Sequence, residues 1–302
     1  MAQASRLAKD LTLKGSSTTI PKLVYGTAWK KDQSADLVYK ALKHGFRGID
    51  TAAQPKHYNE KGVAQGALKA ISDGVIAREA LFIQTKFSPP SAQGENPPYD
   101  LEAPLADKVH QSVQSSLEFF TILGQEPYLD SVVMHSPMKT IEETLTAWKA
   151  LESYVPGKIR NLGISNTTLP VLQALNTQAT VKPSVVQNRF YEGTAFETDL
   201  RAFCREEGIN FQSFWTLSGN PRLFKAQPVK MIAEKAGVPP VAAYYALVLG
   251  LEGVTVLDGT TNEAHMKDDL EGVQNVGTWA EGDGAADWAS ALLSFKELIG
   301  EN

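Results

Sequence analysis

Residue types suited to proton transfer stand where apolar segments of the chain end. In Gly45–Glu60, GFRGIDTAAQPKHYNE, Asp50 closes an apolar strand and Tyr58 lies in a polar turn before a helix. Lys86 and His135 close two later apolar segments. A buried carboxylate or ammonium is costly alone, but Asp50 and Lys86 can neutralise each other. An ammonium beside Tyr58 should lower its phenol pKa from about 10 towards neutrality. We expect Tyr58 to protonate an oxygen that becomes negative as a hydride reaches its carbon, with His135 orienting that oxygen.

Predicted strands and helices alternate along the chain, and these elements must position the groups named above. Eight strands are predicted, at residues 22–28, 46–52, 81–87, 129–136, 161–166, 184–190, 210–215 and 254–260. Amphipathic helical patterns lie between them, and Gly45 and Gly208 are expected to cap two helices in the left-handed conformation. Eight such units in about 300 residues predict an α/β fold, a closed (β/α)8 TIM barrel in one domain, 1–302. A doubly wound sheet is the alternative, but its G-x-G-x-x-G loop does not occur.

In a barrel, the carboxyl ends of the strands meet at one rim. That rim should gather further polar residues, namely Ser165, Asn166, Gln187 and Asp258. Two long loops also leave carboxyl ends, at residues 88–100 and 216–228, and we expect them to be lids or pocket walls.

The composition is that of an ordinary globular protein. The chain is 43% hydrophobic and 21% charged, with a formal net charge of −5, so nothing favours nucleic acid as a partner. The single cysteine, Cys204, excludes an internal disulfide framework. The histidines show no metal-ligand spacing, so no metal is expected. No apolar run approaches the roughly 20 residues that span a bilayer, and no signal-peptide core begins the chain. We expect a cytoplasmic protein that does not bind membranes.

These residues lie in segments that resemble the aldo-keto reductase superfamily over nearly the whole chain. The segments GFRGIDTA, HYNEKGV, FIQTKF, VVMHSP, GKIRNLGISN and VVQNRF follow one another in the family's usual order. The resemblance implies NAD(P)H-dependent reduction of an aldehyde or ketone by a catalytic tetrad of Asp50, Tyr58, Lys86 and His135. Members that reduce C=C bonds carry Glu where His135 stands, so C=O reduction is favoured.

The same resemblance implies a cofactor site and a substrate site. Ser165, Asn166 and Gln187 would hold the nicotinamide carboxamide, and Phe214 would stack on its ring where Tyr is more usual. The other implied cofactor-binding residues are Trp215, Leu217, Asp258, Gly259, Thr260 and Lys267. Trp29, in a segment resembling GTxWK, and Pro89, in the long proline-rich loop, are the expected substrate contacts. The substrate is expected to be a small carbonyl compound, and the protein a monomer.

Two features depart from the family pattern. Asp50 and Tyr58 are three residues further apart than is common, through an insertion whose His57 we expect to face solvent. Asp258 stands where many members have a Lys that grips the 2′-phosphate of NADPH. Two like charges at about 4 Å repel by about 4 kcal/mol at a dielectric near 20. Lys267 is one candidate for the missing cation, and the others are His265, Arg222 and Lys225. The family slightly favours NADPH, and NADH is the alternative because a carboxylate can bind a ribose hydroxyl.

Other interpretations of the same residues remain open. Asp50 and Lys86 form a buried structural ion pair in one of them, and Ser165 with Asn166 only caps a helix in another. A cofactor-binding regulatory protein with little catalysis would keep the same barrel. A barrel isomerase or aldolase would use Lys86 as a Schiff base, although Asp50 would hold that lysine protonated.

Overall fold

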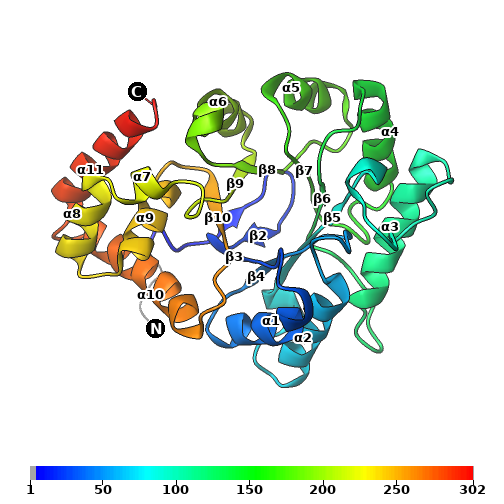
Figure 1. The fold of residues 1–302 in the computed structure, drawn as a ribbon, viewed down its shortest axis with the longest axis horizontal. Coiled ribbons are helices and arrows are strands. Elements are labelled where there is room, and N and C mark those ends of the chain that lie inside the picture. Colours follow the sequence, from blue (N-terminus) through cyan, green and yellow to red (C-terminus); the bar gives the residue numbers. More distant parts are fainter. Residues whose placement is uncertain (1–4, 302) are drawn as a thin grey trace.

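Eight parallel strands form a closed barrel at the centre of the molecule, and helices surround it (Figure 1). The computed structural model describes residues 5–301. Around the barrel the strands follow the order β10-β3-β4-β5-β6-β7-β8-β9. They are β3 (Leu23–Gly26), β4 (Gly48–Asp50), β5 (Phe82–Phe87), β6 (Ser131–Met134), β7 (Leu162–Ser165), β8 (Val185–Arg189), β9 (Asn210–Phe214) and β10 (Val254–Asp258). Each lies inside one of the eight predicted segments, so the predicted TIM barrel is confirmed.

Helices follow the strands and cover the outside of the barrel. They are α1 (Ser34–Lys43), α2 (Glu60–Ser72), α3 (Leu105–Phe119), α4 (Ile141–Glu152), α5 (Leu169–Gln178), α6 (Thr198–Glu207), α7 (Pro221–Phe224), α8 (Gln227–Ala236), α9 (Pro240–Leu249), α10 (Glu263–Ala280) and α11 (Ala285–Leu298). Helix α9 is apolar all round because it packs against β10 on one side and against α8 and α10 on the others.

A short hairpin closes the amino end of the barrel, and the strand pattern did not reveal it. Strands β1 (Leu11–Thr12) and β2 (Thr19–Ile20) pair antiparallel. Leu13 and Ile20 from this hairpin cluster with Val24, Phe82 and Val185, which lie on three barrel strands. The carboxyl end therefore remains the open end of the barrel.

Local sequence signals end the helices where they were expected to. Gly45 and Gly208 have φ values of 113° and 67°, which a residue without a side chain adopts at low cost. Asn59 caps α2, because its Oδ1 accepts from the Gly62 N–H at 2.9 Å. This cap fixes the start of α2 directly after Tyr58.

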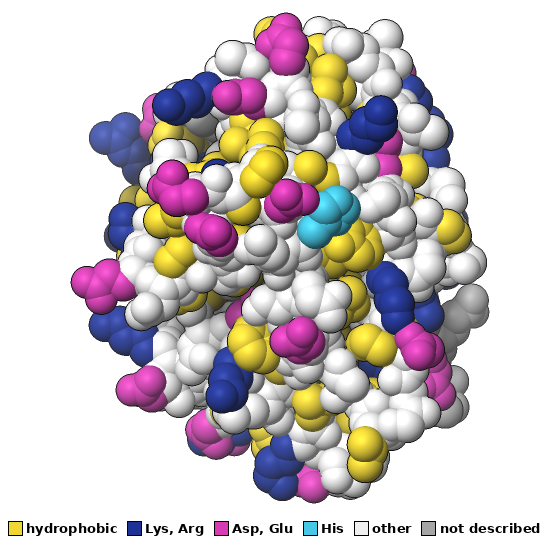
Figure 2. Space-filling model, turned by 90° about the vertical axis from the view of Figure 1, so that its right-hand side faces the viewer, with side chains coloured by type: hydrophobic (Ala, Val, Ile, Leu, Met, Phe, Trp, Pro, Cys, Tyr) yellow, Lys and Arg dark blue, Asp and Glu magenta, His cyan; other side chains and the backbone are white. Residues whose placement is uncertain are grey.

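Charges are mixed on the surface. On the face in Figure 2, acidic and basic side chains are interspersed with apolar ones and no large area carries one sign. Within residues 5–301, no helix combines the length and the apolar character needed to cross a membrane. Cys204 is buried, and Trp148 is buried with its indole N–H donating to the Val181 carbonyl at 2.9 Å.

Candidate active site

A cavity of about 690 Å³ opens at the carboxyl end of the barrel. Its volume lies within the range typical of small-molecule sites. Most residues predicted for catalysis or binding line it: Asp50, Tyr58, His135, Ser165, Asn166, Gln187, Phe214, Trp215, Leu217, Asp258, Gly259, Thr260 and Trp29. Lys86 lies just behind the wall, with 1% of its surface exposed.

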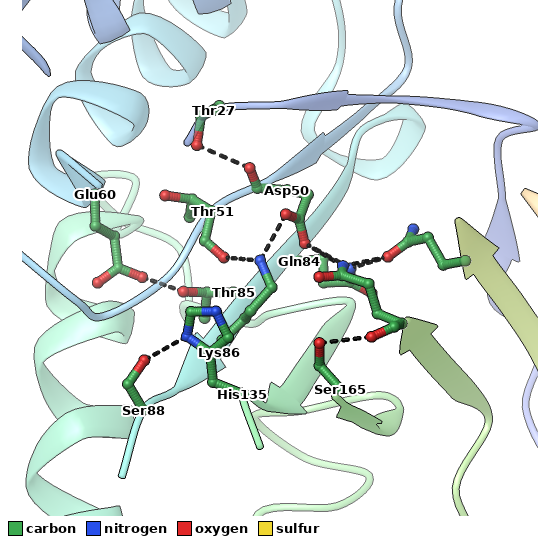
Figure 3. A network of polar contacts seen from close by, with 12 residues as sticks. Thr27, Asp50, Thr51, Glu60, Gln84, Thr85, Lys86, Ser88, His135 and Ser165 are labelled. Carbon is green, nitrogen blue, oxygen red and sulfur yellow. Dashed lines mark hydrogen bonds and ion pairs between the residues drawn. The ribbon is translucent and has the colours of Figure 1, made fainter. Parts of the chain in front are cut away.

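Asp50 and Lys86 form a buried ion pair at the floor of the cavity (Figure 3). Lys86 Nζ donates to Asp50 Oδ2 at 2.6 Å and to the Thr51 carbonyl at 2.8 Å. Burial, the largest single effect, lowers the pKa of Lys86, but Asp50 and Tyr58 together raise it above its usual value. The lysine is therefore held as an ammonium.

Two glutamines hold the other oxygen of Asp50. The side chains of Gln84 and Gln187 each donate from Nε2 to Asp50 Oδ1, at 2.7 and 3.0 Å. Both also donate to Gln212 Oε1 at 2.6 Å. Asp50 pairs in register with Gln84 across β4 and β5, as Gln187 does with Gln212 across β8 and β9. A polar layer thus crosses the barrel. The sequence does not single out Gln84 and Gln212, because strand pairing alone brings them to Asp50.

The insertion between β4 and α2 forms a turn that carries Tyr58 over the ion pair. The Tyr58 N–H donates to the Gln54 carbonyl at 3.0 Å. Gln54 Nε2 donates in turn to the Ala92 carbonyl at 2.8 Å, which ties the insertion to the loop after β5. Lys86 Nζ lies 5.0 Å from the centre of the Tyr58 ring, so phenol and ammonium are neighbours.

The predicted pKa shift of Tyr58 is wrong in direction. Burial is the largest effect and raises the pKa of the phenol, whereas the Lys86 ammonium opposes it. The sequence indicates the neighbouring charge but not the desolvation of the phenol. Tyr58 is therefore a neutral phenol at physiological pH, and Lys86 favours the anion that forms when the phenol gives up its proton.

His135 stands opposite Tyr58 and is held by Ser88, which no sequence pattern singles out. The rings of Tyr58 and His135 lie 5.8 Å apart, centre to centre. Ser88 Oγ is 2.6 Å from His135 Nδ1, and Ser88 is fully buried. Burial, followed by the charge of Lys86, lowers the pKa of His135 to about 3, so the imidazole is neutral.

The contact with Ser88 assigns the tautomer of His135. The Ser88 hydroxyl has no other hydrogen-bond acceptor among residues 5–301, and a buried hydroxyl rarely leaves its hydrogen unpaired. Ser88 therefore donates to Nδ1. The proton of the neutral ring then sits on Nε2, which makes Nε2 a hydrogen-bond donor.

A second buried carboxyl group lies close to Lys86. Glu60 Oε1 accepts hydrogen bonds from the hydroxyls of Thr85 and Ser116. Burial raises the pKa of Glu60 to about 7, and the two hydroxyls and Lys86 oppose that shift. Nothing at sequence level separated Glu60 from an ordinary first-turn glutamate of α2.

The residues expected to hold a nicotinamide carboxamide lie together at the ends of β7 and β8. Ser165 Oγ donates to the Gln187 carbonyl at 2.6 Å, and Asn166 Nδ2 donates to the His135 carbonyl at 2.9 Å. Gln187 Oε1 accepts no hydrogen bond from the described residues, so it can accept from an amide N–H. Phe214, on the neighbouring strand, lines the same part of the cavity. These groups fit a carboxamide and the ring that bears it.

The far end of the cavity is acidic. Asp258 is 1% exposed and Asp269, on α10, is 4% exposed, and both line the cavity. Asp258 Oδ1 accepts from the Thr260 N–H at 3.0 Å. Burial and then the Asp258 charge raise the pKa of Asp269 to about 8, so the two carboxyls share a proton at neutral pH.

Of the four candidate cations for this end, His265 lines the cavity, whereas Lys267, Arg222 and Lys225 do not. Lys267 is exposed, does not line the cavity and sits 3.8 Å from Glu271 on its own helix. Helix periodicity explains this, because His265 and Asp269 face the cavity from α10 while Lys267, midway between them, faces outward. Lys30 is a buried cation whose charge acts on Asp258, and its Nζ donates to the Gly259 carbonyl at 2.8 Å.

The mouth of the cavity is aromatic on the side of the predicted substrate contacts. Trp29 is 63% exposed, and its ring centre lies 4.1 Å from that of His57. His57 is half-buried and lines the cavity, so the expectation that it faces solvent is wrong. Pro89 is buried outside the cavity, and Ala92 is the residue through which that loop reaches it.

Proteins of known function that resemble this chain are carbonyl reductases. The family model described as "Aldo/keto reductase family" matches residues 22–273. An NAD(P)H-dependent D-xylose reductase of Aspergillus niger is 29% identical over 293 residues, which cover 88% of this chain and 89% of that protein. A glyoxal reductase of Bacillus subtilis is 34% identical over 205 residues, which cover 68% of this chain and 65% of that protein.

Solved structures share the fold at lower identity. An aldo/keto reductase from Brucella melitensis superimposes with a TM-score of 0.72 at 24% identity, covering 94% of this chain and 98% of that one. A Bombyx mori aldo-keto reductase in complex with NADP gives 0.71 at 21% identity, with coverage of 90% and 92%. The family model covers well over half of the chain, so the protein belongs to the aldo/keto reductase family and is an oxidoreductase that reduces the carbonyl group of aldehydes or ketones.

Proposed function

We propose that the reduction occurs at the floor of the cavity, with Tyr58 as the proton donor and a nicotinamide dinucleotide as the reductant. The observation that carries this proposal is the enclosure of Tyr58 between the Lys86 ammonium and the His135 ring. Asp50 holds Lys86 in place and charged. The proposal assigns catalysis to Asp50, Tyr58, Lys86 and His135.

The proton transfer follows from the state of each group. A bound nicotinamide supplies the hydride that adds to the carbonyl carbon. His135 Nε2–H and the Tyr58 hydroxyl both donate hydrogen bonds to the carbonyl oxygen and orient it. As negative charge develops on that oxygen, the Tyr58 O–H bond breaks and its proton moves to the oxygen. Lys86 stabilises the phenolate that remains, which lowers the barrier more than it stabilises the neutral ground state.

Replacement of Tyr58 tests this role. Tyr58→Phe removes the proton and keeps the ring, so we expect kcat for an aldehyde to fall by about 10²–10⁴-fold while cofactor affinity stays within a few-fold. The absorbance of the reduced nicotinamide measures turnover, and calorimetry measures the affinity for the cofactor. Tyr39→Phe is the matched control, because that hydroxyl bonds Asp73 on the outside of the barrel. Near-normal turnover of Tyr58→Phe would remove Tyr58 from the mechanism.

We propose NADH as the preferred cofactor, against the slight family preference for NADPH. Asp258 and Asp269 present at least one negative charge where the adenosine ribose is expected, and Lys267 faces away. A carboxylate accepts hydrogen bonds from a 2′-hydroxyl and repels a 2′-phosphate, although Lys30 offsets part of that repulsion. Separate calorimetric titrations with NADH and NADPH at pH 8 should give the tighter constant for NADH. Tighter binding of NADPH would show that another cation reaches the phosphate.

A further inference from the structure

Arg189, at the end of β8, is the one lysine or arginine among the described residues that line the cavity. The other charged or titratable side chains that line the cavity are Asp50, Asp258, Asp269, two tyrosines and three histidines. A permanently cationic side chain in a cavity of otherwise acidic and neutral groups requires an explanation, because its charge is partly withdrawn from water.

The strand register places Arg189 beside the expected nicotinamide ring position. Arg189 lies two residues beyond Gln187, so the two side chains point to the same side of β8. It pairs with Phe214 across β8 and β9, just as Gln187 pairs with Gln212 one layer deeper. Arg189 therefore lies one layer nearer the mouth than the glutamine layer.

An aromatic ring, and not a carboxylate, holds the guanidinium. Its central carbon lies 4.2 Å from the centre of the Trp215 ring. Trp215 adopts a left-handed φ of 54°, which a bulky residue adopts only when its surroundings enforce it. The turn after β9 thus holds the indole under Arg189 at some cost in backbone strain.

The side chain of Arg189 makes no hydrogen bond or ion pair with the residues that the structure describes. Its Nε is buried without a partner. Arg189 is partly buried, whereas the buried arginines Arg78 and Arg201 are paired, with Asp130 at 2.9 Å and with Glu301 at 2.7 Å. Stacking on an indole leaves the terminal N–H donors of a guanidinium unpaired in its plane, which is the geometry that binds carboxylates and phosphates.

We propose that Arg189, stacked on Trp215, is an anion-binding residue of the cavity that pairs with an oxyanion of the bound molecule. This inference rests on the proposed function for the identity of that molecule. Two groups could supply such an oxyanion. One is the diphosphate of the dinucleotide, and the other is an acidic substituent on the carbonyl substrate.

The loop after β9 is compatible with the first source. Thr216, Leu217 and Ser218 line the cavity beside Trp215, and their backbone N–H groups donate to no acceptor among the described residues. Free N–H groups next to a guanidinium suit phosphate oxygens. The second source would place a carboxylate of the substrate above the nicotinamide, within reach of the same guanidinium.

The experiment compares Arg189→Met, Arg189→Lys and wild type. Lys139→Met is the control, because it removes one positive charge from an exposed position that does not line the cavity. Calorimetry at low salt measures binding of NADH, NADPH and inorganic pyrophosphate. Steady-state kinetics measure kcat/KM for 4-carboxybenzaldehyde and for 4-methylbenzaldehyde, which has a similar shape and no charge.

Each outcome decides the proposal. If the anion is the diphosphate, Arg189→Met weakens both dinucleotides and pyrophosphate by about 10- to 100-fold. If the anion is an acidic substituent of the substrate, Arg189→Met leaves dinucleotide affinity unchanged. Its preference in kcat/KM for the carboxylated over the methylated aldehyde then falls by a similar factor. Arg189→Lys keeps the charge and loses the planar fork, so its effect should be intermediate. The proposal is overturned if Arg189→Met behaves like Lys139→Met in every assay.

Failure of the proposed function is recognised separately. In that case wild type binds neither dinucleotide, and the pyrophosphate titration of wild type against Arg189→Met alone decides whether the anion site exists. Arg189→Lys decides the same question if the methionine variant does not fold.

Discussion

At the scale of single residues, the active-site proposal depends on which atoms carry protons. His135 is useful as an orienting donor only if Nε2 bears the hydrogen. Its low pKa keeps the ring neutral, and Ser88 selects the tautomer by donating to Nδ1. Ser88 is thus a positioning residue that acts through His135.

Without the Ser88 hydroxyl, His135 should lose its preference for the tautomer that carries the proton on Nε2. In Ser88→Ala the buried Nδ1 loses its donor, so a fraction of the rings should move the proton to Nδ1. We expect kcat to fall by about 10-fold, which corresponds to about 1.4 kcal/mol, with cofactor affinity unchanged. Nitrogen chemical shifts of His135 report the tautomer directly. An unchanged Nε2–H signal together with unchanged kcat would show that Ser88 only fills space.

At the scale of elements, the first turns of α10 matter because they bring Asp269 against the end of β10. The carboxyls of Asp258 and Asp269 are both nearly buried, and they come from elements that meet only in the folded barrel. The shared proton couples the cofactor site to pH. Above about pH 8 the pair gains a second negative charge, which should weaken NADPH more than NADH.

The same proton predicts how stability depends on pH. The pKa of Asp269 is about 8 in the folded protein and near 3.8 in an exposed chain. Between those values the native state holds a proton that the unfolded state lacks, so stability falls as pH rises from about 4 to 8. Asp269→Asn cannot ionise and should be more stable than wild type at pH 8 by at least about 1 kcal/mol, and equal to it near pH 4.

Urea denaturation at the two pH values measures this difference. Asp283→Asn, in the exposed turn between α10 and α11, is the control and should show no pH-dependent gain. A gain of equal size for Asp269→Asn at both pH values would contradict the shared proton.

At the scale of the whole molecule, the barrel is closed at its amino end, and the residues after α11 are held against α6. The β1–β2 hairpin fills the amino end, which directs ligands to the opposite end. Near the last described residue, Glu301 pairs with Arg201 at 2.7 Å and with Arg205 at 3.1 Å, both on α6. Arg201 is 1% exposed. Glu301 thus neutralises a buried charge on α6, one of the helices that cover the barrel.

Loss of that neutralisation should destabilise the whole domain. Glu301→Ala leaves the Arg201 guanidinium buried without a carboxylate, so we expect a loss of about 3 kcal/mol in the free energy of unfolding. Glu297→Ala removes an exposed carboxylate from α11 and is the control. If both variants unfold in the same single transition at the same urea concentration, the Arg201–Glu301 pair does not stabilise the fold.

The sequence by itself determined the order of the eight strands, the closed barrel and the family. Those features follow from local apolar periodicity, from caps such as Gly45 and Gly208, and from motifs whose order the chain fixes. The sequence also identified the polar residues at the strand ends, since parallel strands bring their carboxyl ends to one rim. That rule brings Asp50, Lys86 and His135 together, the family resemblance adds Tyr58, and the four residues lie together in the structure.

Only the tertiary structure decided the state of those groups. The raised pKa of Tyr58, the tautomer of His135 and the shared proton of Asp258 and Asp269 depend on burial and on partners distant in sequence. Register across β8 and β9 placed Arg189 beside Phe214, and the phase of α10 turned Asp269 inward and Lys267 outward. Packing fixes these properties, because a side chain's surroundings exist only after the barrel closes and cannot be read from its neighbours in the chain.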